Sequence, residues 1–173
     1  VTGGLGFIGS NLIELLLKKK YHVTNLDKVT YSSNFYNTKE FKKSRKYNFI
    51  KCDIKNRKIK NILFKYKPDC IFNLAAESQV LRSADNPLNT YKSNIFGSLN
   101  LFDSIRKLQI NPKIVHASTD KVYGISDNLP YREDHKLYSN FTYDISKISA
   151  DLIAQNYKTI YGLDITLFRS SNI

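Results

Sequence analysis

The sequence predicts a doubly wound α/β fold, in which helices cover both faces of a parallel β-sheet. Apolar strand patterns alternate with amphipathic helix patterns about six times along the 173 residues, which is typical of repeated βαβ units. A glycine-rich turn at residues 3–9 joins the end of the first strand pattern to the first helix pattern, and Asp27 ends the next strand pattern. Because ligands bind at the carboxyl ends of the strands in such folds, we expect the functional residues to gather at that edge.

The N-terminal part of the chain contains three of the strand patterns. Val1 and Thr2 are the last residues of a strand, and the apolar spacing of residues 8–20 predicts a helix whose three terminal lysines suit its negative end. A buried strand is predicted at 21–27 and a third strand at 48–53, separated by a polar loop at 28–38 and a short basic helix. Residues 56–66 predict a further amphipathic helix.

The C-terminal part continues the alternation. Strands are predicted at 70–74, 113–118 and 164–169. A long helix begins at Pro87, which suits a first helical turn, and runs to Lys107. Residues 119–141 predict a loop, and residues 142–161 predict a helix that ends at Gly162, a common C-terminal cap.

The chain is strongly basic, with 27 Lys and Arg against 15 Asp and Glu and a net charge of +12. Such a balance raises nucleic acid as a partner. The lysines are spread over the whole chain, however, and the densest run, at 39–67, is interpreted as a solvated basic face that could also attract an anionic nucleotide substrate. We therefore expect no nucleic-acid partner.

The cysteines, the histidines and the lengths of the apolar runs argue against a metal site and against a membrane-spanning protein. Cys52 and Cys70 lie in strand-like apolar runs and are expected to be buried thiols. His22, His116 and His135 are isolated and form no metal-ligand pattern, so no metal is expected. No apolar run is long enough to span a membrane, and a cytoplasmic location is the default expectation. The chain holds no Met and begins within a strand pattern, so we interpret it as part of a longer protein.

The glycine turn indicates a dinucleotide site. Gly3, Gly6 and Gly9 are three apart, and Gly4, Gly6 and Gly9 also satisfy G-x-G-x-x-G between a strand and a helix. Missing side chains let the backbone approach a pyrophosphate, and the helix N-terminus offers unpaired N–H groups. Asp27 would accept hydrogen bonds from both ribose hydroxyls and repel a 2′-phosphate, which favours NAD over NADP. The alternative is a tight turn that only packs a helix on a strand.

Tyr143 and Lys147 are four residues apart on a predicted helix and so share one face. An ammonium beside a phenol lowers the pKa of the phenol, and the phenolate can take a proton from a substrate hydroxyl while hydride leaves the same carbon. Ser118, at the end of the preceding strand, can share that proton. A second Y-x-x-x-K match, Tyr47 to Lys51, lies in a strand pattern, where the side chains cannot pair in this way.

Five motifs in order, VTGGLGFIGSN, Asp27, NLAAES, STDKVYG and Tyr143–Lys147, resemble the extended short-chain dehydrogenase/reductase family. Within it the chain resembles the nucleotide-sugar 4,6-dehydratases. LDKVTYSSN and AAESQVLRS are similar to the dTDP-glucose enzymes, whereas YDISKISADLIAQNY and STDKVYG look more like the CDP-glucose enzymes. The resemblance implies that residues 1–173 are an NAD-binding Rossmann-type domain, with the C-terminal substrate-binding segment mostly absent.

The resemblance also implies a mechanism. Tyr143 deprotonates the 4-hydroxyl of a nucleotide-diphosphate hexose with help from Ser118 and Thr119, and the C4 hydride passes to a tightly held NAD. Asp120 then protonates the departing C6 hydroxyl while the residue at position 121 removes the C5 proton, and the hydride returns to C6. The dTDP-glucose enzymes resemble STDEVYG, with a glutamate base, where this chain has Lys121. The alternative is that Asp120 and Lys121 are an exposed ion pair on a loop.

A second departure from the dTDP-glucose pattern SHVDRS is at Gln79 and Leu81. Asn94 would lie in the helix behind the site or be an ordinary solvent-facing residue. Arg82 and Arg169 would meet phosphate or pair with acids. By resemblance, the cofactor contacts would be Gly3, Gly6, Phe7, Ile8, Gly9, Asp27, Lys28, Asp53, Ile54, Leu74, Ala75, Ala76, Ser78, Tyr143, Lys147 and Asn172.

The predicted function is an NAD-dependent nucleotide-sugar 4,6-dehydratase that forms a 4-keto-6-deoxy product. The alternatives are a 4-epimerase on the same scaffold and, outside enzymes, an NAD-sensing or nucleic-acid-binding module. The nucleotide and the hexose are not specified by these residues, because such enzymes recognise them mostly through the C-terminal segment. By resemblance, the helices at 87–107 and 142–161 would pair across a homodimer.

Overall fold

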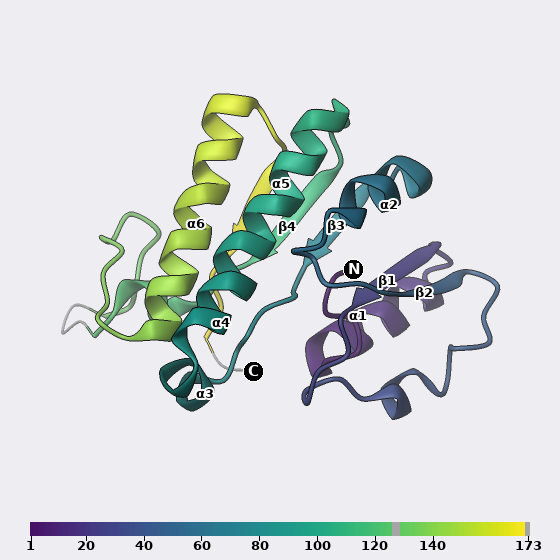
Figure 1. Cartoon of the computed structure of the whole chain (residues 1–173), viewed down its shortest axis with the longest axis horizontal. Helices are drawn as coiled ribbons and strands as arrows, with labels where there is room; N and C mark the ends of the chain where they lie inside the picture. The colour runs from purple at the N-terminus through teal and green to yellow at the C-terminus, as the bar shows by residue number, and fades with distance from the viewer. Residues whose placement is uncertain (126–128, 172–173) are drawn as a thin grey trace.

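The computed structural model describes residues 1–125 and 129–171 (Figure 1). Within them a parallel sheet is formed by β1 (Val23–Asp27), β2 (Tyr47–Lys51), β3 (Cys70–Asn73), β4 (Lys113–Ala117) and β5 (Ile165–Phe168). β1 pairs with β2, and β4 lies between β3 and β5. Thr2 bridges Leu26 on one side and Asn73 on the other, so the first residues of the chain occupy the centre of the sheet.

Helices cover both faces of this sheet. Val23 belongs to an apolar cluster with Ile13 of α1 (Phe7–Lys18), whereas Leu26 packs on the larger cluster around Phe102. Residues three apart on a strand point to opposite faces, so the two clusters lie on opposite sides of the sheet. The larger cluster is covered by α2 (Lys58–Tyr66), α5 (Gly97–Leu108) and α6 (Thr142–Tyr161), and Figure 1 shows α5 and α6 side by side. The predicted doubly wound α/β fold is confirmed.

Three local expectations were wrong. The basic helix expected after the loop at 28–38 is not formed: a 3₁₀ turn, Phe35–Thr38, ends that loop, and only turns follow it before β2. The long helix from Pro87 consists of α4 (Pro87–Tyr91), a π-helical segment (Lys92–Phe96) and α5, and it is preceded by an additional helix, α3 (Val80–Asp85). Cys52 is buried as expected, but Cys70 is exposed because it is the first residue of its strand.

Buried His116 makes the stability of the fold depend on pH. Burial, with a smaller contribution from the Lys147 charge, lowers the pKa of this imidazole to about 3 from its ordinary value of 6.5. Between these values the unfolded chain binds a proton that the folded chain does not, so acid favours unfolding. We expect the free energy of unfolding to fall by about 1.4 kcal/mol per pH unit as the pH drops from 6.5 towards 3, measured by urea denaturation.

Two variants test whether His116 causes this pH dependence of stability. His116→Gln should lose that part of the slope, whereas His22→Gln, at an exposed position, should keep it. Equal slopes in all three proteins would show that His116 is protonated in the folded state.

None of the helices in the described residues has the length and apolar character to cross a membrane. The same residues contain no cluster of three or more His, Cys, Asp or Glu side chains arranged to hold a metal ion.

Candidate functional site

A cavity of about 930 Å³ opens at the carboxyl edge of the sheet. Its walls come from the turn after Thr2, from the segments that follow β1, β2, β3 and β4, and from the start of α6. The predicted cofactor contacts in the described residues all line it: Gly3, Gly6, Phe7, Ile8, Gly9, Asp27, Lys28, Asp53, Ile54, Leu74, Ala75, Ala76, Ser78, Tyr143 and Lys147. The remaining one, Asn172, lies outside the described residues.

The glycine turn brings the N-terminus of α1 to this cavity. Gly3 has φ +71°, and a Cβ there would lie 3.0 Å from the backbone of Ala75. A Cβ on Gly9 would lie 2.4 Å from the Gly3 carbonyl oxygen, so both positions require the absence of a side chain. Gly6 caps α1 without a side-chain hydrogen bond, which leaves the first helical N–H groups for an anion. This cradle fits a pyrophosphate.

Gly9→Ala tests how closely the turn is packed. The added methyl group overlaps the Gly3 carbonyl oxygen, so we expect the free energy of unfolding to fall by about 1–3 kcal/mol, measured by urea denaturation. Gly162→Asn is the matched control, because Gly162 has φ +68° with no atom within 4 Å, and Asn adopts this conformation readily. A Gly9 variant as stable as the control would contradict the observed close approach.

Asp27 is held rigidly at the end of β1. Its buried carboxylate accepts hydrogen bonds from the backbone N–H groups of Leu5 (3.0 Å) and Val29 (2.8 Å) and from the Ser33 hydroxyl (2.8 Å). The bond to Val29 holds a β-branched residue at φ +63°, a conformation that such residues rarely adopt. The carboxylate is thus fixed on the cavity wall, where remaining lone pairs can accept the hydroxyl groups of a ribose.

The opposite part of the cavity is lined by the predicted catalytic groups Ser118, Thr119, Tyr143 and Lys147. Burial, and to a lesser extent the neighbouring Asp144, raises the pKa of Tyr143 to about 12, while a hydrogen bond with Thr119 partly opposes that rise. Burial lowers the pKa of Lys147 to about 8. Two hydroxyl groups, a phenol and an amine therefore converge beside a space that could hold a substrate.

One expectation about this group was wrong. Lys147 was predicted to lower the pKa of Tyr143, but its ammonium group donates a hydrogen bond to the Ala117 carbonyl, and the pKa of Tyr143 is raised. The amine is directed to the end of β4, the phenol interacts with Thr119, and the pKa of Tyr143 is set by its burial, by Thr119 and by the neighbouring acids.

Sequence reasoning missed Asp151, which lies behind the catalytic groups with no exposed surface. Its carboxylate accepts a hydrogen bond from the Ser118 hydroxyl (2.7 Å) and two from the Arg169 guanidinium (2.9 Å each). Burial would raise the pKa of Asp151, but the hydrogen bonds from Arg169, Ser118 and Gln155 hold it below its usual value. Arg169 therefore pairs with an acid, which decides a question that the sequence left open. The four-residue spacing from Lys147 could have indicated Asp151.

Asp120 and Lys121 lie next to this site, on a 3₁₀ turn (Asp120–Tyr123) directly after Thr119. Both are half-buried, and neither lines the cavity. The Thr119 hydroxyl donates to the Asp120 carboxylate at 3.2 Å. Among the ion pairs of the described residues, none joins Asp120 to Lys121, so the structure does not place them in the exposed ion pair that was the alternative.

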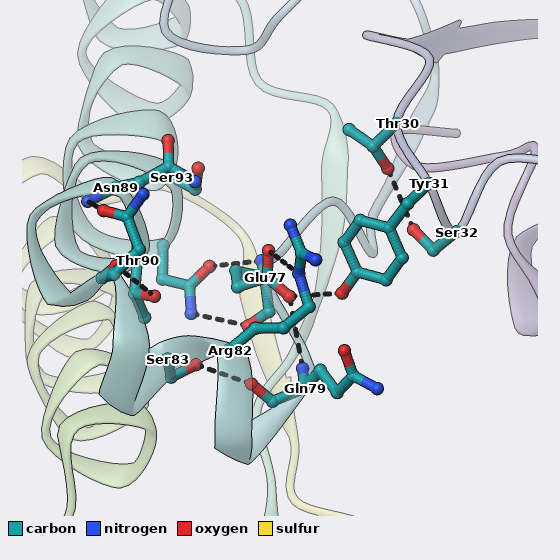
Figure 2. A network of polar contacts seen from close by, with 12 residues as sticks. Thr30, Tyr31, Ser32, Glu77, Gln79, Arg82, Ser83, Asn89, Thr90 and Ser93 are labelled. Carbon is teal, nitrogen blue, oxygen red and sulfur yellow. Dashed lines mark hydrogen bonds and ion pairs between the residues drawn. The ribbon is translucent and has the colours of Figure 1, made fainter.

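Asn94 and Arg82 were also left open, and the structure places both. Asn94 is 1% exposed and holds both backbone polar groups of Glu77, its Oδ1 accepting from the N–H at 2.7 Å and its Nδ2 donating to the carbonyl at 3.0 Å. It therefore lies behind the site and not at the surface. Arg82 covers the ring of Tyr31 and lies 3.9 Å from the Glu77 carboxylate (Figure 2). Arg82 thus pairs with an acid.

Other residues of the cavity wall were not predicted as site residues from the sequence, because their apolar, thiol or hydroxyl side chains belong to none of the five motifs: Leu12, Leu26, Thr30, Ser32, Ser33, Cys52, Phe72, Ser93, Val115, Ala117, Phe168, Ser170 and Ser171.

Comparisons with known proteins agree on one group of enzymes. A family model described as GDP-mannose 4,6 dehydratase matches residues 1–173. The dTDP-glucose 4,6-dehydratase of Salmonella typhimurium is 33% identical over 99% of this chain and 53% of its own length. The UDP-glucose 4-epimerase of Mycolicibacterium smegmatis is 32% identical over 100% of this chain and 55% of its own length.

A solved structure of the same group of enzymes also matches this chain. The crystal structure of the dTDP-glucose 4,6-dehydratase from Streptomyces venezuelae, with NAD and TYD bound, superposes with a TM-score of 0.91 at 33% identity. The match covers 97% of the present chain and 53% of the Streptomyces venezuelae chain. The present chain therefore spans about half the length of the relatives that it matches.

Proposed function

Because this chain belongs to the GDP-mannose 4,6-dehydratase family of extended short-chain dehydrogenases/reductases, we propose that it is the cofactor-binding part of an NAD-dependent enzyme that modifies nucleotide sugars. One observation carries the proposal. Residues predicted as dinucleotide contacts and four of the six residues predicted as catalytic, Ser118, Thr119, Tyr143 and Lys147, come from six segments of the chain and line one cavity. A dinucleotide sensor would need the glycine turn and Asp27, but it would have no use for the hydroxyl groups and amine opposite them.

The cavity fits NAD by its chemistry. The α1 N-terminus and the glycine turn would hold the pyrophosphate, Asp27 the adenosine ribose, and Asp53 with Ile54 the adenine. Lys147 would hold the second ribose. When bound, NAD would supply a hydride acceptor for the sugar and a positive charge that favours the Tyr143 phenolate.

Within this class we propose a 4,6-dehydratase. Tyr143 would take the proton of the sugar 4-hydroxyl, and Thr119 and Ser118, which lie on the same wall, would relay it. Asp120 would protonate the departing C6 hydroxyl, and Lys121 would remove the C5 proton that the 4-keto group makes acidic. The hydride would then return to C6 and a proton to C5, so that the net change is the loss of one water. The position of these two residues directly after Thr119 supports their roles.

An epimerase is the second candidate, because 4-epimerases are also among the relatives. The purified protein should be incubated with CDP-, dTDP-, UDP- and GDP-hexoses without added NAD while the mass of each sugar is followed. We expect one of them to lose a single water with no accumulation of NADH. An isomer of unchanged mass would favour the epimerase, and no turnover of any sugar would contradict both.

The variant Lys121→Gln distinguishes the dehydratase reaction from the epimerase reaction, because only the dehydratase reaction needs a base at this position. If Lys121 is the base, the variant should lose water elimination by about 10²-fold or more, because general bases contribute about 10²–10⁴. A Lys136→Gln control, in the loop between Asp120 and α6, should react normally. Elimination at the wild-type rate in the Lys121 variant would show that another group is the base.

We also propose that the protein forms a homodimer through its helical layer. Apolar side chains remain exposed on the π-helical segment and on α6, among them Phe96 (58%) and Leu152 (51%). Light scattering measures the molar mass in solution. We expect the mass of a dimer for the wild-type protein and the mass of a monomer for the Leu152→Lys variant.

A further inference from the structure

Three side chains join the two walls of the cavity from outside: Tyr31, Glu77 and Arg82, together called the clasp. The Tyr31 hydroxyl donates to Glu77 Oε1 at 2.5 Å, and the Arg82 guanidinium lies 3.9 Å from the centre of the Tyr31 ring (Figure 2). Arg82 Nε is also 3.9 Å from Glu77 Oε2. Each member thus contacts both of the others.

The Glu77 side of the clasp is anchored. Glu77 is 8% exposed, and Asn94 binds both its backbone N–H and its carbonyl. Asn94 in turn donates to the Ser146 hydroxyl at 2.9 Å, which lies on α6 between Tyr143 and Lys147. The wall that carries Glu77 is therefore fixed to the helix that carries the catalytic phenol and amine.

The Tyr31 side belongs to the segment after Asp27, on the opposite wall. Tyr31 does not line the cavity, but its neighbours Thr30 and Ser32 do. Glu77 is likewise flanked by Ala76 and Ser78, which line the cavity from the segment after β3. The hydrogen bond between Tyr31 and Glu77 therefore connects the wall at the end of β1 to the wall at the end of β3.

We propose that the clasp holds these two walls together around a bound dinucleotide, so that NAD leaves the cavity only when the contact between Tyr31 and Glu77 opens. This inference rests on the proposed function, in which the same NAD accepts a hydride and returns it within one turnover. A cofactor that is regenerated in place has no need to exchange, and a contact that slows its release prevents loss of the reduced form before the hydride returns.

Tyr31 remains the hydrogen-bond donor of the clasp well above neutral pH. Burial, followed by the hydrogen bond to Glu77, raises the pKa of Tyr31 to about 12, so the phenol keeps the proton that it donates. Its acceptor is a carboxylate, and hydrogen bonds to charged acceptors are about twice as strong as neutral ones.

The test measures cofactor release and needs no sugar. The protein is loaded with radiolabelled NAD, an excess of unlabelled NAD is added, and the label that remains bound is followed by rapid filtration. Tyr31→Phe removes the donor and keeps the ring under Arg82, so we expect release about tenfold faster than from the wild-type protein. Glu77→Gln keeps an acceptor without its charge and should have a smaller effect.

Tyr36→Phe is the matched control, since Tyr36 is a 67% exposed tyrosine of the same loop whose hydroxyl contacts only Lys39 in the described structure. Its release rate should equal that of the wild-type protein. Thermal unfolding without NAD establishes that the variants are folded.

Unchanged release from Tyr31→Phe would overturn the clasp, whatever the protein does to sugars. A wild-type protein that binds no NAD would overturn both the clasp and the proposed function. Faster release together with no sugar turnover would support the clasp and contradict only the proposed reaction.

Discussion

Tyr143→Phe is expected to slow the reaction with the nucleotide sugar by about 10³-fold while the protein still binds NAD. The variant removes one hydroxyl from a side chain that is 9% exposed and leaves its ring in place, so the fold should be unaffected. Positioned acid–base groups contribute about 10²–10⁴ to a rate, and Tyr143 is the phenol that lines the proposed sugar end of the cavity. The measurement is the single-turnover rate of sugar oxidation at saturating substrate.

The pH dependence of the reaction rate also tests Tyr143 as the base. The pKa of Tyr143 is about 12 before any cation is bound beside it, so the active phenolate becomes scarcer as the pH falls. We expect the wild-type rate to rise with pH and the residual rate of the variant to lack this rise. Tyr138→Phe, at a 59% exposed tyrosine in the preceding loop, is the control and should match the wild-type protein. A Tyr143 variant that kept more than a tenth of the activity would contradict the assignment of the base.

Asp151→Asn is expected to lower the free energy of unfolding by about 3–5 kcal/mol, because it leaves the guanidinium of Arg169 without its carboxylate in a largely buried position. Asp151 has no exposed surface, and the Arg169 side chain is 14% exposed. The remaining partners of Arg169, the Tyr123 hydroxyl and the Glu133 carbonyl, are neutral. Urea denaturation of the wild-type protein and the variant measures the difference.

A surface ion pair provides the control. Arg132→Met breaks the contact with Asp134, in which both side chains are about 70% exposed, and the denaturation midpoint should not change. A loss below about 1 kcal/mol in Asp151→Asn would show that water solvates the guanidinium in the variant. The same variant replaces one carboxylate oxygen with an amide NH₂ group and removes the negative charge that the Ser118 hydroxyl donates to, so it should also lower activity in the fraction that remains folded.

The patterns that predicted the fold are local ones. The turn at residues 3–9 requires glycines partly for local reasons, the positive φ of Gly3 and the closeness of Gly9 to the Gly3 carbonyl, and the spacing of Tyr143 and Lys147 follows from a single helix. The structure places all of these residues on one cavity because parallel strands end at the same edge.

What the sequence did not predict depends on the order of strands and on packing between distant segments. Asp151 and Arg169 meet because α6 packs on β5, which no local spacing reveals. Lys147 donates to the Ala117 carbonyl at the end of β4, an acceptor 30 residues away in the sequence. The clasp joins Tyr31 and Glu77, which lie 46 residues apart in the sequence. The helix α3 has six residues, too few for a helical period to stand out.

The return of the C4 hydride to C6 is the central claim of this account, and a sugar labelled with deuterium at C4 tests it most directly. The nucleotide hexose that the protein consumes is converted in the presence of excess unlabelled NADH, and the product is analysed by mass and by NMR. The account predicts a product that has lost one water and carries the deuterium at C6. Deuterium that stays at C4 in a product of unchanged mass, or that is replaced by hydrogen from the added NADH, would contradict it.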